Sequence, residues 1–393
     1  MKKSPLKILD IKDTCTGCGA CVSSCSKGAI QLEYDAEGFY FPTHNPTRCI
    51  DCKLCEKACH ILNTKTLDTP SRVYTPHMVK AKSKDTVKAS SSGGVFSILA
   101  EHTLAMGGVV YGARYNHDTE RLEHSSTDLH PLSEFKKSKY FESYMGTTFQ
   151  EVALQLKKGR QVLFVGTPCH VSALHHYLET KKIATKTLIL ARFICHGVPS
   201  NRFFTEYKHW IENKVGSRLK YFDFRPKVRG WRISNILLEF SNGKILDEIC
   251  QSNYFYFYFQ NNFTLRRSCY NCKKLFNEEA DITMADFWGI HKYAPKNTDD
   301  EGISLLLLHN DKARNLFGEI QNMFYSEVLP QSAVDYIYKD SVDKEAQFEE
   351  RNKKMEEIAK CGYMNHAISN FKWVIRKEKL KDFLRKQRDK FKK

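Results

Sequence analysis

Two short runs of cysteine constrain this chain more than any other feature. The segment CTGCGACVSSC sets Cys15, Cys18, Cys21 and Cys25 at x2, x2, x3 spacing, and CIDCKLCEKAC repeats that spacing with Cys49, Cys52, Cys55 and Cys59. The N-terminus has no apolar leader behind its lysines, and no run of about 18 apolar residues occurs, so we expect a protein of the reducing cytoplasm. In that compartment fourteen cysteines grouped in this way indicate metal ligands and not disulfides.

The repeated spacing is highly specific for a bacterial-type ferredoxin with two 4Fe-4S clusters. Three closely spaced thiolates bind three corners of a cubane, and the fourth cysteine of each run ligates the other cluster. The spacing therefore predicts one cluster on Cys15, Cys18, Cys21 and Cys59, and the other on Cys49, Cys52, Cys55 and Cys25. Structural zinc, the alternative, needs two pairs of cysteines and has no use for the third cysteine of a run. Where ferredoxins usually have proline after the fourth cysteine, this chain has Ser26 and His60.

The remaining sequence predicts a larger α/β domain behind this unit. With 393 residues and 41% apolar content, the chain is long enough for two or three domains. We expect a ferredoxin domain at 1–66, a linker at 67–79, a larger domain at 80–335 and a helical basic tail at 336–393. Helical and strand patterns alternate from about residue 80, with Ser92 as the expected cap of the first helix, which predicts a mostly parallel sheet. Beyond about residue 215 the pattern becomes strand-rich, with a hairpin at SNG.

Half of the net positive charge lies in one terminal segment. The formal net charge is +16, and residues 371–393 hold eleven Lys and Arg against three Asp and Glu. No other feature supports a nucleic-acid partner, so none is expected. On a helix the apolar residues of this segment leave a broad face to Lys and Arg, which predicts peripheral contact with an anionic membrane or an acidic partner. The alternative is a helix that docks its apolar stripe on its own domain. The stripe consists of Phe371, Ile375, Phe383 and Leu384, with Trp373 and Leu380 to the side.

Seven segments of the larger domain resemble one known family. SSGGVFSILAEHTLAMGGVVYGARY, SKYFESYMG, VLFVGTPCHVSAL, FICHGVPS, FRPKVRGW, LRRSCYNC and ADITMADFWGI occur here in the order found in the coenzyme F420 hydrogenase/dehydrogenase beta-subunit family. The resemblance covers about residues 80–325, and the family also includes fusions to an N-terminal ferredoxin. It implies a flavin-binding domain that holds FAD beside a 4Fe-4S cluster and exchanges a hydride with a deazaflavin or another two-electron partner.

Four further cysteines predict a third metal site. Cys169 and Cys195 each follow a predicted strand, so both are expected at the carboxyl edge of the sheet, where such folds bind ligands. The C-x2-C pair Cys269 and Cys272 would complete four thiolates there. We predict a third 4Fe-4S cluster; the alternative is zinc held by Cys269 and Cys272 together with His170 and His196. Two cysteines lie outside these groups and are expected to be ordinary thiols: Cys250 and Cys361.

The G-x-G-x-x-G fingerprint of dinucleotide-binding folds is absent. The flavin is therefore expected at a different glycine-rich turn. The turn SSSGG precedes a helix, so Ser91, Ser92, Gly93 and Gly94 would offer a pyrophosphate their backbone N–H groups and the positive helix end. The resemblance implies that four more residues line the same cleft: Lys139, Tyr140, Thr167 and Asp286. For Asp286 the alternatives are a strand end or the partner of a buried arginine.

His170 and His196 are the candidate proton-handling groups beside the flavin, because imidazole titrates near neutral pH. The alternative for each is a buried histidine with its hydrogen bonds satisfied. The family more often has Gln at the position of His170, and an acidic residue at Pro226, which lies beside Lys227, Gly230 and Trp231. Because of these two departures from the family pattern, the sequence alone does not identify the substrate and does not assign F420 to this chain.

Together these features predict a cytoplasmic FAD- and 4Fe-4S-dependent oxidoreductase. It would relay electrons between a redox partner protein, such as a ferredoxin-type donor, and a small-molecule or coenzyme substrate, F420-like or another. The expected path is the two N-terminal clusters, the third cluster and then FAD. The alternative is a non-catalytic electron-transfer subunit whose partner holds the substrate site.

Overall fold

The cysteine-rich N-terminal segment folds as a small unit of two helices and one β-hairpin. The computed structural model describes residues 6–63, 74–272, 279–293, 300–334 and 344–390. The N-terminal unit contains α1 (Ala20–Ser24), β1 (Ile30–Tyr34), β2 (Tyr40–His44) and α2 (Leu54–Lys57). β1 and β2 are antiparallel, with Ile30 opposite His44 and Tyr34 opposite Tyr40. Its own core is small, which suits a unit held together by metal more than by apolar packing.

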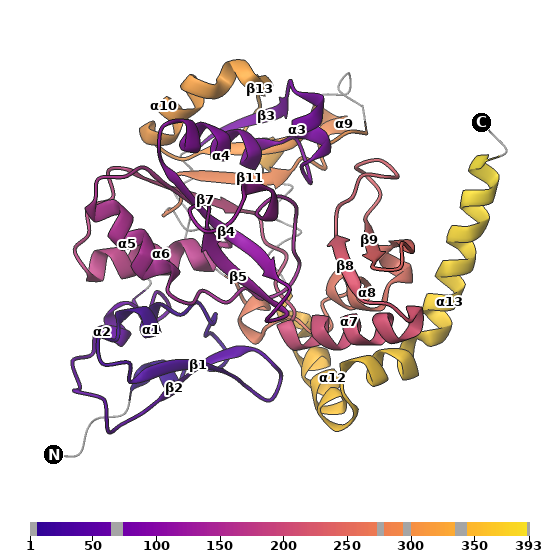
Figure 1. Cartoon of the computed structure of the whole chain (residues 1–393), viewed down its shortest axis with the longest axis horizontal. Helices are drawn as coiled ribbons and strands as arrows, with labels where there is room; N and C mark the ends of the chain where they lie inside the picture. Colours follow the sequence, from indigo (N-terminus) through magenta and orange to yellow (C-terminus); the bar gives the residue numbers. More distant parts are fainter. Residues whose placement is uncertain (1–5, 64–73, 273–278, 294–299, 335–343, 391–393) are drawn as a thin grey trace.

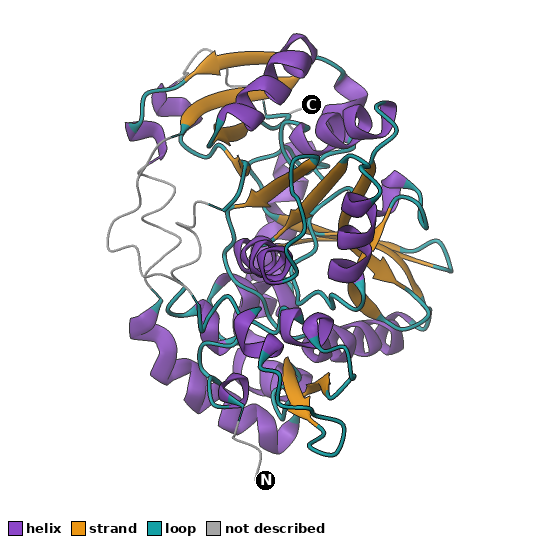
Figure 2. Ribbon diagram, turned by 90° about the vertical axis from the view of Figure 1, so that its left-hand side faces the viewer, coloured by secondary structure: helices purple, strands orange, loops and turns teal. Residues whose placement is uncertain are grey.

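An eight-stranded sheet forms the centre of the larger part (Figure 1). In spatial order its strands are β13 (Phe324–Val328), β3 (Thr75–Ala81), β12 (Ser304–Leu308), β11 (Ile282–Asp286), β7 (Leu188–Phe193), β6 (Val162–Gly166), β4 (Val109–Asn116) and β5 (Arg121–Ser126). The pairs β4–β6, β6–β7 and β7–β11 are parallel, and the other pairs are antiparallel. It follows that β3, β11, β7, β6 and β4 all end at the same edge, and the predicted α/β fold is confirmed with a mixed sheet in which these five of the eight strands run in one direction. Figure 2 places the N-terminal hairpin at the opposite end of the molecule from β13 and β3.

Helices cover both faces of this sheet, which explains why its central strands are continuous apolar runs. Every residue of β6 (VLFVG) and of β12 (SLLLL) is buried. On one face α5 (Thr148–Lys157) and α6 (Pro168–Thr180) pack in the cluster that contains Val109. On the other face α4 (Val95–Ala105) and α10 (Asp311–Ile320) pack in the cluster that contains Val110. Successive residues of β4 thus face opposite layers, as the two-residue period of a strand requires. Two further short helices lie in the described residues of this part: α3 (Lys84–Lys88) and α9 (Ile290–Tyr293).

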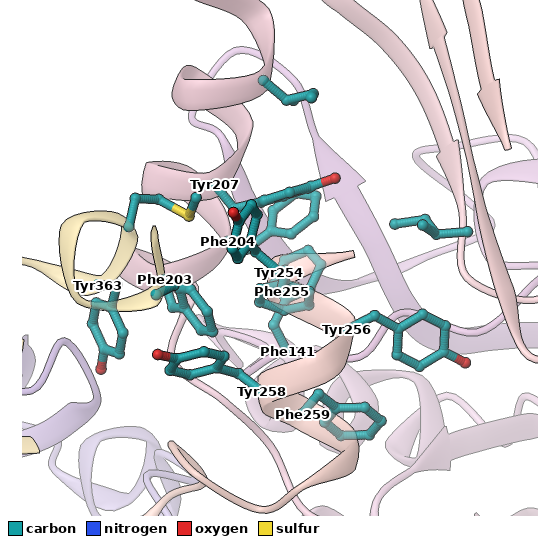
Figure 3. Packing of buried hydrophobic residues seen from close by; sticks show 14 of the residues in the cluster. Phe141, Phe203, Phe204, Tyr207, Tyr254, Phe255, Tyr256, Tyr258, Phe259 and Tyr363 are labelled. Carbon is teal, nitrogen blue, oxygen red and sulfur yellow. The ribbon is translucent and has the colours of Figure 1, made fainter. Parts of the chain in front are cut away.

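A three-stranded sheet and an aromatic core form the strand-rich second half. The sheet has the order β10 (Ile245–Ile249), β9 (Asn235–Phe240), β8 (Leu219–Asp223), and β9 and β10 form the hairpin predicted at SNG. Beside it, α7 (Asn201–Val215) and α8 (Tyr254–Gln260) meet in the cluster of rings that Figure 3 shows. Phe141 stacks on Phe204 at 4.2 Å between ring centroids, and Phe203 on Tyr363 at 4.7 Å.

The two C-terminal helices join this aromatic core to the N-terminal unit. They are α12 (Phe348–Cys361) and α13 (Tyr363–Lys390). The hydroxyl of Tyr363 donates to the carbonyl of Glu37 at 2.6 Å, and the fully buried Arg351 forms an ion pair with the Glu37 carboxylate. Arg267 binds the same carboxylate at 2.9 Å. Breaking a buried ion pair typically costs about 3–5 kcal/mol, so the C-terminal helices fix the N-terminal hairpin against the larger part.

Two expectations about boundaries differ from the structure. The linker expected at 67–79 lies partly outside the described residues, and from Thr75 onward its chain forms β3, because the apolar and threonine-containing sequence TPHMVKA pairs with both β12 and β13. Ser92 does not cap α4. The cap is Gly94, with φ of 95°, and the Ser92 hydroxyl donates instead to the carbonyl of Ile303 at 2.9 Å.

No helix among the described residues is both long and apolar enough to cross a lipid bilayer.

Candidate functional site

Eight cysteines of the N-terminal unit line two cavities of crossed composition. One cavity is lined by Cys15, Cys18, Cys21 and Cys59, and the other by Cys25, Cys49, Cys52 and Cys55. Each cavity takes three thiols from one run and the fourth from the other run, as the spacing rule requires. Burial raises the pKa of the Cys18 thiol to about 12 and that of Cys55 to about 11. Such thiols become thiolates when a bound metal supplies the compensating charge.

The two cysteine runs adopt matching backbone turns. Gly17 and Gly19 have φ of 65° and 75°, and the equivalent residues of the second run, Asp51 and Lys53, have φ of 57° and 58°. A left-handed conformation costs a non-glycine residue about 1–2 kcal/mol, so the second loop accepts strain to keep the same shape. Glycine is required at position 17 for another reason. An added Cβ there would lie 2.8 Å from the Arg266 guanidinium and 2.9 Å from the Tyr40 carbonyl.

A second group of four cysteines meets at the carboxyl edge of the large sheet. Cys169 lies in the first turn of α6 directly after β6, Cys195 follows β7, and Cys269 ends a short 3-10 turn, Arg267–Cys269, that precedes Cys272. Burial raises the pKa of Cys169, and the thiols of Cys195, Cys272 and Cys269 raise it further. The four thiols are therefore close enough to interact electrostatically, although they come from three distant segments. We call them the edge quartet.

A buried lysine faces the edge quartet. The Lys344 ammonium donates to the carbonyl of His196, and Lys344 is buried. Burial lowers the pKa of Lys344, whereas the thiols of Cys269, Cys195 and Cys272 favour its charged form. A cation in this place suits an anionic group held by the four cysteines.

Arg266 connects the edge quartet to the N-terminal unit. Its guanidinium donates to the carbonyls of Cys15 and Tyr40, both at 2.7 Å, and its Nη2 lies 3.8 Å from the Cys15 sulfur. It also forms a buried ion pair with Glu142 at 2.5 Å. Although burial opposes it, attraction from Glu142, Cys15 and Cys269 raises the pKa of Arg266. One fixed positive charge thus acts on a thiol of the first N-terminal cavity and on a thiol of the edge quartet.

The spacing of the ligand atoms bears on whether the described cysteines could share a single zinc ion. Zinc binds thiolates at about 2.3 Å, which sets neighbouring sulfurs of a tetrahedron about 3.8 Å apart. Within the described ranges, the one group of three or more His, Cys, Asp or Glu ligand atoms that lie within 4.8 Å of one another is His175, His176 and Glu279. No three thiols of the described cysteine sets come that close together. A cubane does not require sulfurs that close together, because its four thiolates bind separate iron atoms.

His170 and His196 lie next to Cys169 and Cys195 of the edge quartet, and the first is buried and the second half-buried. The His196 Nε2 lies 3.2 Å from the Phe259 carbonyl, and the His170 ring packs edge-on against His124 at 5.0 Å. Burial lowers the pKa of His196 to about 4 and that of His170 well below its usual value. The His196 contact corresponds to the satisfied-histidine alternative, whereas the buried His170 Nδ1 has no hydrogen-bond partner among the described residues, and the proton-handling role of both residues stays a prediction.

The serine and glycine turn lies where β3 ends and β12 begins. Ser91 accepts a hydrogen bond from the backbone of Ser138 at 2.9 Å, and the Gly93 N–H donates to the Ser304 hydroxyl at 2.9 Å. The Lys227 ammonium donates to the carbonyl of Ser92 at 2.6 Å. The turn is therefore held by hydrogen bonds to neighbouring segments, and the Lys227 ammonium is bound to one of its backbone carbonyls.

Half-buried lysines place positive charge near this turn. Burial, reinforced by the charge of Lys137, lowers the pKa of Lys227 to about 7. Burial also lowers the pKa of Lys139 to about 7, and its ammonium donates to the carbonyls of Lys136 and Lys137. Ammonium groups held in such surroundings favour a bound anion, which makes the donor set suitable for a pyrophosphate.

Aromatic rings and an arginine surround Asp286 at the end of β11. Asp286 accepts a hydrogen bond from the Trp231 indole at 3.0 Å and pairs with the buried Arg225 at 3.5 Å. Trp231 stacks on Trp288 at 4.7 Å. Asp286 is thus the partner of a buried arginine, which is one of the alternatives that the sequence left open for it. Tyr140 stacks on Phe259 at 4.8 Å, and Thr167 caps α6 and lies 3.0 Å from the Cys169 sulfur.

Several residues of the site were not foreseen from the sequence, namely Arg266, Glu142, Lys344, Arg225 and Trp288. LRRSC did place two arginines beside a predicted ligand, but nothing in the sequence indicated that one of them would contact Cys15, 251 residues away. Cys250 is buried in the aromatic core and Cys361 is exposed on α12, and both lie outside the three cysteine sets.

The crossed cavities and the sheet behind them define an iron–sulfur electron-transfer protein with an α/β domain. Residues 14–61 match the 4Fe-4S dicluster domain, and residues 159–333 match the C-terminal domain of the coenzyme F420 hydrogenase/dehydrogenase beta subunit. Residues 159–333 therefore contain a domain of this beta-subunit family, and the resemblance of the motifs is confirmed.

Two further comparisons add little. A chain of the F420-reducing [NiFe] hydrogenase complex from Methanosarcina barkeri is 14% identical, with 72% of this chain and 91% of that chain covered and a TM-score of 0.45. That similarity is too weak to carry an argument about this chain. No curated protein matches it.

Replacing Arg266 should change the reduction potential of the first N-terminal cluster. We expect Arg266→Gln to lower the potential of the cluster on Cys15, because a buried cation beside that thiol stabilises the added electron. A charge-assisted hydrogen bond contributes about 1.5 kcal/mol, so the shift should be on the order of 50 mV. A redox titration followed by electron paramagnetic resonance measures it.

Two companion variants make this test interpretable. The variant Arg266→Gln with Glu142→Gln avoids an unpaired buried carboxylate, and Arg48→Gln removes an exposed arginine of the same unit. We expect the shift in the first companion and none in the second, because solvent screens an exposed charge. An unchanged potential in both Arg266 variants would contradict the assigned role.

Proposed function

We propose that the chain is an FAD- and 4Fe-4S-dependent oxidoreductase that relays electrons between a ferredoxin-type donor and a hydride-exchanging substrate. The substrate is a small molecule or coenzyme, F420-like or another. When bound, the clusters would carry one electron at a time, and FAD would exchange two electrons as a hydride. FAD would thereby link the one-electron donor to the two-electron substrate. The chain's own residues position these groups and control access to them.

One observation carries the proposal: the predicted cofactor residues lie along a single edge of the sheet. The turn of Ser91 to Gly94 lies at the end of β3, Asp286 ends β11 and Trp288 follows it, Cys195 follows β7, and Thr167 and Cys169 follow β6. Ligands of open α/β sheets bind outside the carboxyl ends of the strands. This order supports a pyrophosphate at one end of the edge and a metal cluster toward the other.

The residues at each position fit the group proposed for it. The turn of Ser91 to Gly94, with Lys227 and Lys139, offers backbone donors and positive charge to the two phosphates of FAD. Between the turn and the edge quartet, Trp288 and Phe193 remain 38% and 39% exposed at the ends of adjacent strands. Exposed rings in that place suit a planar heterocycle, which gains from aromatic stacking.

The edge quartet supports a third 4Fe-4S cluster in the same way. No three of its thiols lie within 4.8 Å of one another, as thiolates that share one zinc ion would, and the cations Lys344 and Arg266 face them. Because Arg266 also contacts Cys15, the quartet adjoins the first N-terminal cavity. The second N-terminal cavity contains Cys52, which is exposed, and this is the side we assign to the external donor.

Removing the edge quartet should separate the N-terminal clusters from the flavin. In Cys269→Ser with Cys272→Ser, we expect reduction of bound flavin by a reduced one-electron donor to fall to the background rate, while both N-terminal clusters keep their spectra. Anaerobic stopped-flow absorbance measures the flavin step. Cys361→Ser is the matched control, because it removes an exposed cysteine outside the three sets, and it should react like the unmodified chain. Flavin reduction at the original rate in the double variant would exclude these cysteines from the path.

Binding of FAD should weaken as the pH rises above 7. The pKa values of Lys227 and Lys139 are lowered to about 7, so both ammonium groups are protonated below that pH and lose their charge above it. A pyrophosphate binds the protonated form, and its affinity should fall by up to about tenfold per pH unit for each proton required. Equilibrium titration of the apo-flavoprotein between about pH 6 and 9 measures the dependence.

Substitution of Lys227 tests whether this lysine is responsible. We expect Lys227→Met to bind FAD more weakly at low pH and to show a flatter pH profile, whereas Lys158→Met, an exposed position directly after α5, should leave the profile unchanged. A profile of unchanged slope in Lys227→Met would remove this lysine from the site.

A further inference from the structure

The 28-residue helix α13 presents two chemically different faces. One face is fixed to the chain: Ile375 is buried, Asp382 binds Arg229 at 2.5 Å, and Lys379 binds Glu248 at 2.5 Å. Lys386 adds a contact to Asp247 at 3.5 Å. These contacts hold one side of the helix against β10 and against Arg229 in the segment between β8 and β9, and they correspond to the docking on its own domain that was the alternative from the sequence.

The opposite face of α13 exposes large apolar side chains. Trp373 is 72% exposed, Leu380 60%, Leu384 57% and Phe383 56%. Positions 373, 380 and 384 are separated by seven and four residues, so they share one side of the helix. The apolar stripe expected from the sequence is therefore divided between two sides of the helix. Phe371 and Ile375 pack on the aromatic core, whereas the other four side chains face outward.

The charge around this outer face is positive. Five exposed cationic residues surround the apolar side chains: Arg376, Lys377, Lys381, Arg385 and Arg388. Two of the three acidic residues between 371 and 393 are paired with basic side chains: Asp382 binds Arg229, and Glu378 binds Lys381. The Lys377 ammonium also lies over the Trp373 ring at 5.2 Å, which combines cation and indole at one place.

We propose that this face of α13 rests on an anionic lipid surface. Tryptophan and leucine would enter the boundary between head groups and acyl chains, and the arginines and lysines would bind lipid phosphates, as in interfacial helices. A protein partner fits less well, since lysine is depleted at the centres of protein interfaces, whereas here cations are interleaved with the apolar residues. The contact would be reversible, because it combines shallow insertion with salt-screened attraction.

The position of α13 would leave the electron-entry side accessible. In Figure 1 the C-terminal half of α13 stands clear of the body, on the opposite side of the molecule from the N-terminal unit. A chain bound through α13 would thus keep the N-terminal cavities in the aqueous phase, where a soluble donor can reach them.

Vesicle flotation tests the proposal on the full chain with its cofactors. The probes are vesicles of phosphatidylcholine with phosphatidylglycerol, and vesicles of phosphatidylcholine alone. We expect binding to the anionic vesicles at low salt, release at high salt and no binding to the neutral ones. Blue-shifted emission of Trp373, identified by its loss in Trp373→Phe, should accompany binding.

Three variants separate the parts of the surface. Leu380→Glu with Leu384→Glu should abolish binding, and Arg376→Gln with Lys377→Gln and Lys381→Gln should weaken it on the order of a hundredfold. Leu129→Glu, which changes a leucine that is 67% exposed elsewhere, is the matched control and should bind normally. Unchanged iron content and circular dichroism show that each variant is folded.

Three results would overturn the proposal. The first is failure of the unmodified chain to bind anionic vesicles, and the second is undiminished binding by the Leu380 and Leu384 variant. The third is a concentration-dependent dimer that this variant abolishes, without vesicle binding, because it would assign the face to a second copy of the chain.

Discussion

The buried ion pair between Arg266 and Glu142 is the contact on which the rest of the arrangement depends. Both side chains are almost fully buried, and such a pair is tolerated only where further hydrogen bonds satisfy the remaining donors. The carbonyls of Cys15 and Tyr40 supply those acceptors, and both belong to the N-terminal unit. Gly17 leaves the space that the guanidinium occupies. The N-terminal unit therefore cannot move away from the larger part without exposing an unpaired buried charge.

A second junction holds the same two parts together from the other side. Glu37, in the loop between β1 and β2, is bound by Arg351, Arg267 and Tyr363. Although burial opposes it, the two arginines lower the pKa of Glu37, so its charge is retained at neutral pH. With one junction at Cys15 and the other at Glu37, the first cysteine cavity has a fixed orientation toward the edge quartet. That rigidity suits electron transfer, because it sets a distance that does not depend on chain motion.

The cysteine pattern predicted the local structure well, since ligand spacing constrains short loops directly. The crossed sets of the N-terminal unit and the positions of Cys169 and Cys195 after buried strands follow from spacing and strand direction alone. The contacts of Arg266, Lys344 and Asp286 could not be predicted in that way, because each joins segments that are distant in the sequence. Ser92 shows a different limit. Its position before a helix suggested a cap, but the strand start at Ser304 lies close enough to take over the hydrogen bonding of the turn.

The central claim is that twelve cysteines hold three cubane clusters and that the same edge of the sheet holds one FAD. The most direct test is the iron, acid-labile sulfide, zinc and flavin content of the anaerobically purified chain. The account predicts about twelve iron atoms, about as many sulfides and one FAD per chain, with no stoichiometric zinc. About eight irons with one zinc would contradict the third cluster, and a preparation that neither contains nor binds FAD would contradict the flavin site.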